Sequence, residues 1–253
     1  MRLNKVAIAV LVVFLFTGCE GKRAKAPAPP EEEANISGDQ KMMAFSLSGF
    51  EKTGKKKWEV QGESADIVSE VVNLTDVIAK AYGDQSDMTL TADRGSFNRA
   101  TNDAHFESNV VVSGTNGTEM KTDALDWKNA EQKIVTDRPV KMKSEAKTPT
   151  TITCDGPMEI DYGKSYAVFN KNVKVDDDRG QLSCDTATAY YDTKTKQVSK
   201  IIAKGNVKIM REGSWTYSDE ATYLSADKKI ILTGKPRLVL YSTDDLKGVM
   251  TGE

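Results

Sequence analysis

Apolar and polar side chains alternate one by one in short stretches that recur along most of the chain. Near residue 200, for example, the apolar Ile201, Val207 and Ile209 are interspersed with polar residues such as Asn206 and Lys208. A period of two places successive side chains on opposite faces of a β-strand. No window keeps the period of a helix, which is about 3.6 residues. The pattern therefore predicts an all-β fold whose sheet has one apolar face.

The same alternation assigns a set of side chains to this apolar face. They are Leu90, Phe97, Phe106, Val110, Val112, Met120, Leu125, Ile134, Val140, Met142, Phe169, Val173, Val175, Leu182, Ile201, Val207, Ile209 and Leu232. Polar turn sequences separate the stretches, and two of them, Asn116-Gly117 and the run from Asp176 to Gly180, suit hairpin connections. We therefore expect antiparallel strands joined by short turns.

Two short motifs mark a repeat of about 30 residues along the chain. The first is a small residue followed by aspartate: Ala65-Asp66, Ala92-Asp93, Thr122-Asp123, Cys154-Asp155, Cys184-Asp185 and Ser218-Asp219. The second follows after a nearly fixed interval: Asn109-Val110, Pro139-Val140, Asn172-Val173, Asn206-Val207 and Pro236 before Leu238. Self-similarity at such a period is typical of a repeat array.

The alternation changes parity just after the aspartate of the first motif. In the series Met120, Thr122, Leu125 and Trp127, the step from Thr122 to Leu125 is one residue longer than the others. A residue inserted as a β-bulge would keep both halves facing the same side and would bend the strand. About two strands per repeat over about six repeats give roughly a dozen strands and no helix to cover their apolar face. We therefore expect an elongated antiparallel sheet that folds over on itself.

The first 18 residues have the pattern of a secretion signal. Arg2 and Lys5 precede an apolar run that is too short to span a bilayer, and small residues lead up to Cys19. This order resembles the lipobox of bacterial lipoproteins, so we expect a signal peptide at 1–18 and lipidation of Cys19. Residues 19–44 are rich in proline and glutamate at their start and predict a disordered tether. The domain would then be periplasmic and held to a membrane by its lipid.

Composition and candidate chemistry exclude several functions. The net charge of −2 is spread along the chain, whereas nucleic-acid binding requires a concentrated basic face. The single histidine, His105, lies on the polar side of a strand without a nucleophile motif. Cys154 and Cys184 occur singly and do not make a zinc motif, and the run from Asp176 to Asp178 lacks calcium-loop spacing. We expect no enzyme activity, no metal and no cofactor.

Cys154 and Cys184 occupy equivalent positions in adjacent repeats. If each repeat is a strand pair, they lie two strands apart, about 9.6 Å, beyond the ~7 Å limit for a disulfide. We expect small buried residues there. A bridge between them would instead indicate stacking by single strands.

Several motifs together resemble a known family. They are the repeated G-N-V or K-N-V, the A-D-x-G-x-F-N of Ala92 to Asn98, the D-T-A-T-A-Y-Y of Asp185 to Tyr191, and the L-T-G-K-P of Leu232 to Pro236. The stretch from Phe45 to Leu240 is similar to the OstA/LptA and LptC periplasmic components of lipopolysaccharide export. The N-terminal anchor ahead of Trp58-Glu59-Val60 looks more like LptC.

The resemblance implies a β-jellyroll, or "β-taco", whose apolar cleft binds acyl chains with the 18 side chains given above. It implies an LptC-like part at 45–149, an OstA/LptA-like part at 150–242 that continues the same sheet, and a tail at 243–253. Lipopolysaccharide or a related glycolipid would pass along a protein bridge between membranes. Partners would be an inner-membrane ABC transporter complex and an LptA-like bridge protein, joined by β-augmentation of edge strands.

Two alternatives stay open at this point. The LptC-like role favours the inner membrane for the lipid anchor, and the outer membrane is the other choice. A structural or adhesive β-repeat lipoprotein with a packed interior would show the same alternation and would transport no lipid. The two functions differ in whether the interior admits acyl chains.

Overall fold

The computed structural model describes residues 40–83, 86–145, 149–192, 195 and 197–240. Within these ranges the chain forms strands and turns and no helix, so the predicted all-β fold is confirmed. The expected signal peptide, Cys19 and the tail at 243–253 lie outside the described residues, as does the tether up to residue 39.

The described residues contain 16 strands in one sheet. The first eight are β1 (Gln40–Phe50), β2 (Lys56–Val68), β3 (Val71–Ala81), β4 (Met88–Asn98), β5 (Ala104–Gly114), β6 (Thr118–Lys128), β7 (Lys133–Thr136) and β8 (Val140–Ser144). The other eight are β9 (Thr150–Cys154), β10 (Met158–Asp161), β11 (Tyr166–Asp177), β12 (Gly180–Tyr191), β13 (Val198–Arg211), β14 (Ser214–Leu224), β15 (Lys229–Thr233) and β16 (Arg237–Val239).

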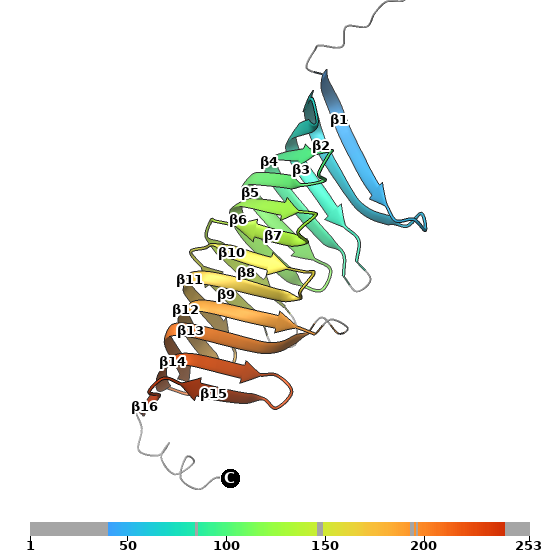
Figure 1. Ribbon diagram of the computed structural model, residues 1–253. Helices are drawn as coiled ribbons and strands as arrows, with labels where there is room; N and C mark the ends of the chain where they lie inside the picture. The colour runs from blue at the N-terminus through green and yellow to red at the C-terminus, as the bar shows by residue number, and fades with distance from the viewer. Residues whose placement is uncertain (1–39, 84–85, 146–148, 193–194, 196, 241–253) are drawn as a thin grey trace, which may run out of the picture. The chain divides into compact units, whose positions relative to one another are not determined.

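Strands that follow one another in the sequence lie side by side in the sheet, except across the breaks between β7 and β8, β9 and β10, and β15 and β16, and every pair is antiparallel. The order runs from β1 to β7, then from β10 to β15, with β8, β9 and β16 off this path. Figure 1 shows this stack from β1 in blue to β14 and β15 in red. Each sequence repeat therefore adds strands to one end of the same sheet.

The sheet folds over because each long strand belongs to two layers. The end of β6 pairs with β7, whereas its beginning pairs with β8. In the same way, β11 pairs with β10 through its beginning and with β9 through its end. We call the layer that contains β7, β10 and β15 the first layer, and the layer that contains β8, β9 and β16 the second layer. The line where strands cross from one layer to the other is called the corner.

Proline explains why some strands are interrupted at the corner and others are continuous. Pro139 separates β7 from β8, Pro157 separates β9 from β10, and Pro236 separates β15 from β16. Proline has no N–H to donate to a ladder, so it is found at strand ends and breaks. The 16 strands thus occupy 13 positions along the sheet, close to the dozen that the repeats predict.

Three of the continuous strands, β5, β11 and β13, turn the corner through two residues in the left-handed region. These pairs are Ser108-Asn109, Lys171-Asn172 and Gly205-Asn206, all with positive φ. The register shifts at each pair, where two residues on this strand face one on the next strand. The bulge that the sequence predicts at the first motif therefore has its extra residue on the neighbouring strand, at the second motif.

The apolar core runs continuously through the folded sheet. Its buried side chains extend from Val60 on β2 to Ala221 on β14. β1 begins at Gln40, five residues inside the range expected for the tether. The expected boundary between residues 149 and 150 falls within the same unit, because residues 39–253 are not divided further.

Candidate functional site

The two sequence motifs meet at the corner, and their polar residues bond on the outside of the sheet. Nδ2 of Asn109 donates to Oδ2 of Asp93 at 2.7 Å, and Nδ2 of Asn206 donates to Oδ2 of Asp185 at 2.9 Å. The equivalent bond from Asn172 to Asp155 is 2.5 Å long. Asparagine also tolerates the left-handed conformation better than most residues. At these three corners asparagine on one strand is therefore joined to aspartate on its neighbour, whereas Pro139 and Pro236 take the place of asparagine in two other repeats.

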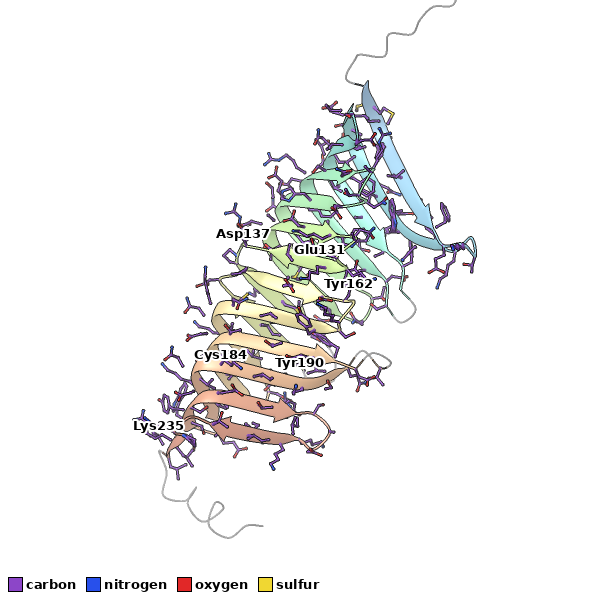
Figure 2. All side chains as sticks on the ribbon, viewed as in Figure 1. Glu131, Asp137, Tyr162, Cys184, Tyr190 and Lys235 are labelled. Carbon is purple, nitrogen blue, oxygen red and sulfur yellow. The ribbon has the colours of Figure 1, made fainter. Side chains whose placement is uncertain are left out.

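The apolar residues of the same motifs pair on the inside of the corner. The cross-strand pairs are Val110 with Thr122, Val140 with Cys154, Val173 with Cys184, and Val207 with Ser218. All eight side chains are buried. Figure 2 shows Asp137, Cys184 and Lys235 toward the corner, and Tyr162 and Tyr190 toward the hairpin turns on the other side. One side of the folded sheet is therefore closed by this line of valines.

The structure places all 18 predicted side chains on the inner side of the sheet, at two levels of burial. Ten are buried: Leu90, Phe97, Phe106, Val110, Met120, Leu125, Val140, Phe169, Val173 and Val207. Eight are half-buried: Val112, Ile134, Met142, Val175, Leu182, Ile201, Ile209 and Leu232. On β11 and β13 burial declines from Val173 to Val175 and from Val207 to Ile209, whereas inner side chains near other hairpin turns, such as Phe97, stay buried.

Each layer carries one continuous row of side chains on its inner side, from neighbour to neighbour across the strands. The first-layer row is Phe97, Ala104, Trp127, Ile134, Ile160, Ala167, Ala189, Ile201, Tyr223 and Ile230. The second-layer row is Leu90, Val112, Met120, Met142, Ile152, Val175, Leu182, Ile209, Thr216 and Leu238. The rows span β4 to β15 and β4 to β16, and Thr216 alone interrupts their apolar character.

Sequence reasoning missed some members of these rows. Ile152 on β9 alternates with Thr151 and Thr153, which is a strand signal, and its side chain packs against the core. Its strand is short because Pro157 interrupts it, so the alternation covers few residues. Ile160 on β10 was missed for the same reason. Trp127 packs against the core and donates from Nε1 to the hydroxyl oxygen of Tyr162 at 3.1 Å.

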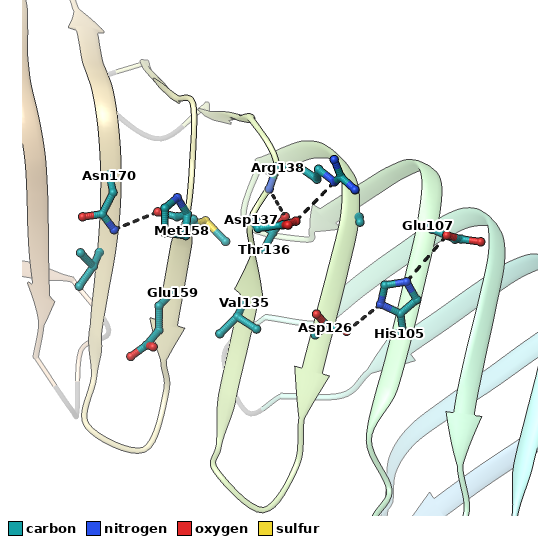
Figure 3. Close-up of a pocket in the computed structure, with 13 residues that line it drawn as sticks. His105, Glu107, Asp126, Val135, Thr136, Asp137, Arg138, Met158, Glu159 and Asn170 are labelled. Atoms are coloured by element: carbon teal, nitrogen blue, oxygen red, sulfur yellow. Dashed lines mark hydrogen bonds and ion pairs between the residues drawn. The ribbon is translucent and has the colours of Figure 1, made fainter.

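An open groove of about 740 Å³ lies on the outer side of the first layer (Figure 3). His105 and Asp126 face it with Nδ1 and Oδ1 2.7 Å apart, and Nε2 of His105 lies 3.9 Å from Glu107. Arg138, also on its wall, is 3.4 Å from Asp137. Glu159 and Glu107 on the same wall form ion pairs with Lys133 and Arg94, which lie outside the groove lining. No group of three or more metal-ligating side chains occurs among the described residues.

Both described cysteines are free thiols buried at the corner. Cys184 lies opposite Val173 of β11, and Cys154 belongs to β9 on the other side of β11, so one strand separates them. Burial raises the pKa of Cys184 to about 11, and burial also raises the pKa of Cys154. A protonated, buried thiol is neither a nucleophile nor a metal ligand at neutral pH. These cysteines therefore contribute small side chains to the core.

Comparison with protein families identifies the fold. Residues 6–156 match the family model described as lipopolysaccharide assembly, LptC-related. The chain belongs to this LptC-related family. Residues 151–252 match a second model, that of the LptA and LptD N-terminal domain lipopolysaccharide-transport proteins. The LptC-related chain is thus a lipopolysaccharide-transport component of the periplasm in which an LptC-like part is followed by an LptA-like part.

Comparison with solved structures finds a protein of the same transport system. The LptC-related chain is similar to the crystal structure of LptH, the LptA-homologous periplasmic component of the lipopolysaccharide transport device of Pseudomonas aeruginosa. The identity is 10% and the TM-score 0.35, over 61% of this chain and 95% of that one. No curated protein matches the sequence. Over the described ranges, no helix is long and apolar enough to cross a membrane.

Proposed function

We propose that this protein is a conduit for lipopolysaccharide, whose acyl chains bind between the two inner rows and move along them. The observation that carries the proposal is the continuity of the rows from β4 to β15 and β16. Acyl chains require contiguous apolar area and no directed hydrogen bonds, at about 25 cal/mol per Å² buried. Because each row continues from strand to strand, an acyl chain that moves along it contacts a similar apolar surface at each strand.

The half-buried part of the inner surface supports this function. Val173 at the corner is fully buried, whereas Val175, two residues further along β11, is half-buried. The corner therefore keeps the layers together, while half-buried side chains such as Val175 are accessible to a ligand. Covering a half-buried apolar surface with an acyl chain removes it from water, which lowers the free energy of the complex.

The two ends of the sheet support a bridge made by pairing of edge strands. β1 pairs only with β2, and β15 only with β14, among the described strands. Apolar side chains are exposed at both edges: Met43 is 70% exposed on β1, and Ile230 and Ile231 are 44% and 39% exposed on β15. Exposed edges with apolar side chains are suited to β-augmentation. We propose an ABC transporter complex and an LptA-like bridge protein as the partners.

The sequence supplies the proposed attachment. Lipidation of Cys19 and a tether before β1 would hold the domain near a membrane, and the LptC-like part favours the inner membrane. Stable anchoring requires more than one acyl chain or a second signal. Mass spectrometry of the membrane-extracted protein measures whether the mature chain begins at an acylated Cys19.

Site-specific photocrosslinking in cells tests the conduit. A photoreactive amino acid at Val112, Met142 or Ile209 lies on the second-layer row, whereas one at Lys208 faces outward on the same strand as Ile209. We expect the three inner positions, and not the control, to crosslink to lipopolysaccharide. Val140, Val173 and Val207 are less suitable because they are buried at the corner.

The rival is a structural or adhesive array whose interior is only packed. It predicts crosslinks to protein from all four positions and none to lipopolysaccharide, and that result would refute the conduit.

A further inference from the structure

Three alanines lie next to one another on the inner side of the first layer. Ala187 of β12 faces Ala203 of β13, which faces Ala221 of β14. All three are buried. The row is bounded by Phe169 of β11 on one side and Leu232 of β15 on the other. We call this part of the interior the alanine section.

Larger apolar side chains fill most of the equivalent positions nearer the N-terminus, the exceptions being Gly95 on β4 and the polar Thr136 on β7. The larger side chains are Phe106, Leu125 and Met158 on β5, β6 and β10, and each is buried. Less apolar area is buried between the layers where alanine replaces such residues, and the attraction that holds the layers together falls with that area. Less apolar side-chain area thus holds the layers together at the three alanine positions than at Phe106, Leu125 and Met158.

A buried hydroxyl without a partner lies in the same section. Ser218 of β14 is 8% exposed and pairs across the corner with Val207 on the inner side of the sheet. Its Oγ has no hydrogen-bond partner within the part of the chain that the structure describes. A buried polar group without a partner loses its bonds to water and gains none in return.

The equivalent hydroxyl and thiol of two other repeats bond locally, whereas the hydroxyl of Ser218 does not. Oγ1 of Thr122 donates to the carbonyl oxygen of Ala124 at 3.3 Å, and Sγ of Cys184 donates to that of Thr186 at 3.3 Å. Ser218 makes no such bond to the second residue after it. A buried unpaired group of this kind calls for a partner outside the chain.

We propose that an acyl chain lodges in the alanine section, between β12 and β14, with one of its oxygen atoms bonded to Oγ of Ser218. The inference rests on the proposed function. It adds the place where the acyl chain is held and the chemical group, an oxygen atom, that the acyl chain must contain. The ligand class is an acyl lipid with an oxygen on or at the end of the chain. That oxygen belongs either to a chain hydroxyl or to the carboxyl or ester group.

Binding of two fatty acids of equal length to the full-length protein tests the proposal, one of them hydroxylated and one not. Both are measured by displacement of a fluorescent fatty acid, alongside purified lipopolysaccharide. The variant is Ser218→Ala, and the matched control is Ser183→Ala, whose side chain lies on the outer side of β12 opposite Lys208. A neutral hydrogen bond corresponds to a change in affinity of about five-fold.

We expect wild type and Ser183→Ala to prefer the hydroxylated acid about five-fold, and Ser218→Ala to lose this preference. An equal loss for both acids in Ser218→Ala also supports the proposal and assigns the bond to the carboxyl oxygen. Unchanged affinity of Ser218→Ala for both acids overturns the inference and leaves the conduit intact. If neither acid nor lipopolysaccharide binds wild type, the proposed function fails and the inference fails with it.

Filling the section gives a second, independent readout. Ala203→Phe places a ring where the proposal puts the acyl chain, and Ala221→Leu is a smaller change of the same kind in case the first does not fold. We expect either variant to weaken binding of both acids at least ten-fold. Retention of wild-type affinity in a folded variant contradicts the location.

Discussion

Nδ2 of Asn206 on β13 donates a hydrogen bond to Oδ2 of Asp185 on β12, 2.9 Å away across the corner of the folded sheet. Asn206 belongs to one sequence motif and Asp185 to the other, so the bond joins the two motifs of the repeat. On the inner side, Val207 faces Ser218 of the following strand. The repeat is therefore a corner unit that recurs along the sheet.

Two variants at Asn206 separate the hydrogen bond from the backbone conformation. Asn206→Gly keeps access to positive φ and removes the bond, so we expect the free energy of unfolding to fall by about 1 kcal/mol. Asn206→Ala removes the bond and also places an alanine in the unfavourable left-handed conformation, so we expect the free energy of unfolding to fall by about 1 kcal/mol more. Urea unfolding monitored by tryptophan fluorescence measures both. Equal stability of the two variants would contradict the role given to the backbone.

A charge at the corner should disrupt the fold. Val173 is 0% exposed, so Val173→Asp buries a carboxylate without a partner, and we expect a loss of more than about 3 kcal/mol. Lys174→Asp is the matched control, because the neighbouring side chain is exposed on the other side of β11. We expect it to change the stability by about 0.5 kcal/mol or less. Thermal unfolding of wild type, Val173→Asp and Lys174→Asp measures these differences in stability. Similar midpoints for the three proteins would mean that Val173 is not in the core.

The buried thiol of Cys184 makes stability depend on pH in alkaline solution. Burial raises its pKa from the ordinary value of 9.0 to about 11. The folded state therefore keeps the proton where the unfolded state has lost it, and the contribution to stability is lost as the pH rises from 9.0 through about 11. Each unit of difference corresponds to about 1.4 kcal/mol at most.

Comparison with Cys184→Ala isolates this contribution from tyrosine and lysine groups that titrate in the same range. The stability of wild type relative to the variant should fall between pH 9 and 11 and stay constant between pH 6 and 8. A constant difference over the whole range would show that the thiol is not buried in the folded state.

Edge pairing at the C-terminal end should be sensitive to charge. Ile231 on β15 is exposed, and lysine on an edge strand opposes pairing with another strand. We expect Ile231→Lys to weaken binding to an LptA-like bridge protein, as measured by analytical ultracentrifugation of the mixture, with little change in thermal stability. Thr188→Lys, on the same outer side of the central strand β12, is the control and should associate as wild type does. Equal association of both variants would exclude β15 as a docking edge.

The sequence alone specified the strands, their faces and the positions of the corners. Alternation at a period of two is a local property, so Val173 and Val175 could be assigned to one face before any pairing was known. The motifs at Asp185 and Asn206 were also visible, because each corner requires particular residue types. Short strands such as β9 and β10 were harder to predict, since proline leaves too few residues for an alternation to be recognised.

Tertiary structure decided what depends on contacts between distant residues. Val173 and Val175 have the same residue type and the same face, yet one is buried and the other half-buried, because their distances from the corner differ. The adjacency of Ala187, Ala203 and Ala221 arises from register across three strands. The hydroxyl of Ser218 is likewise unpaired because the neighbouring strands place no hydrogen-bond partner within its reach. Local sequence determines which face of the strand a side chain lies on. Strand pairing and the distance between the layers determine which residues that side chain contacts.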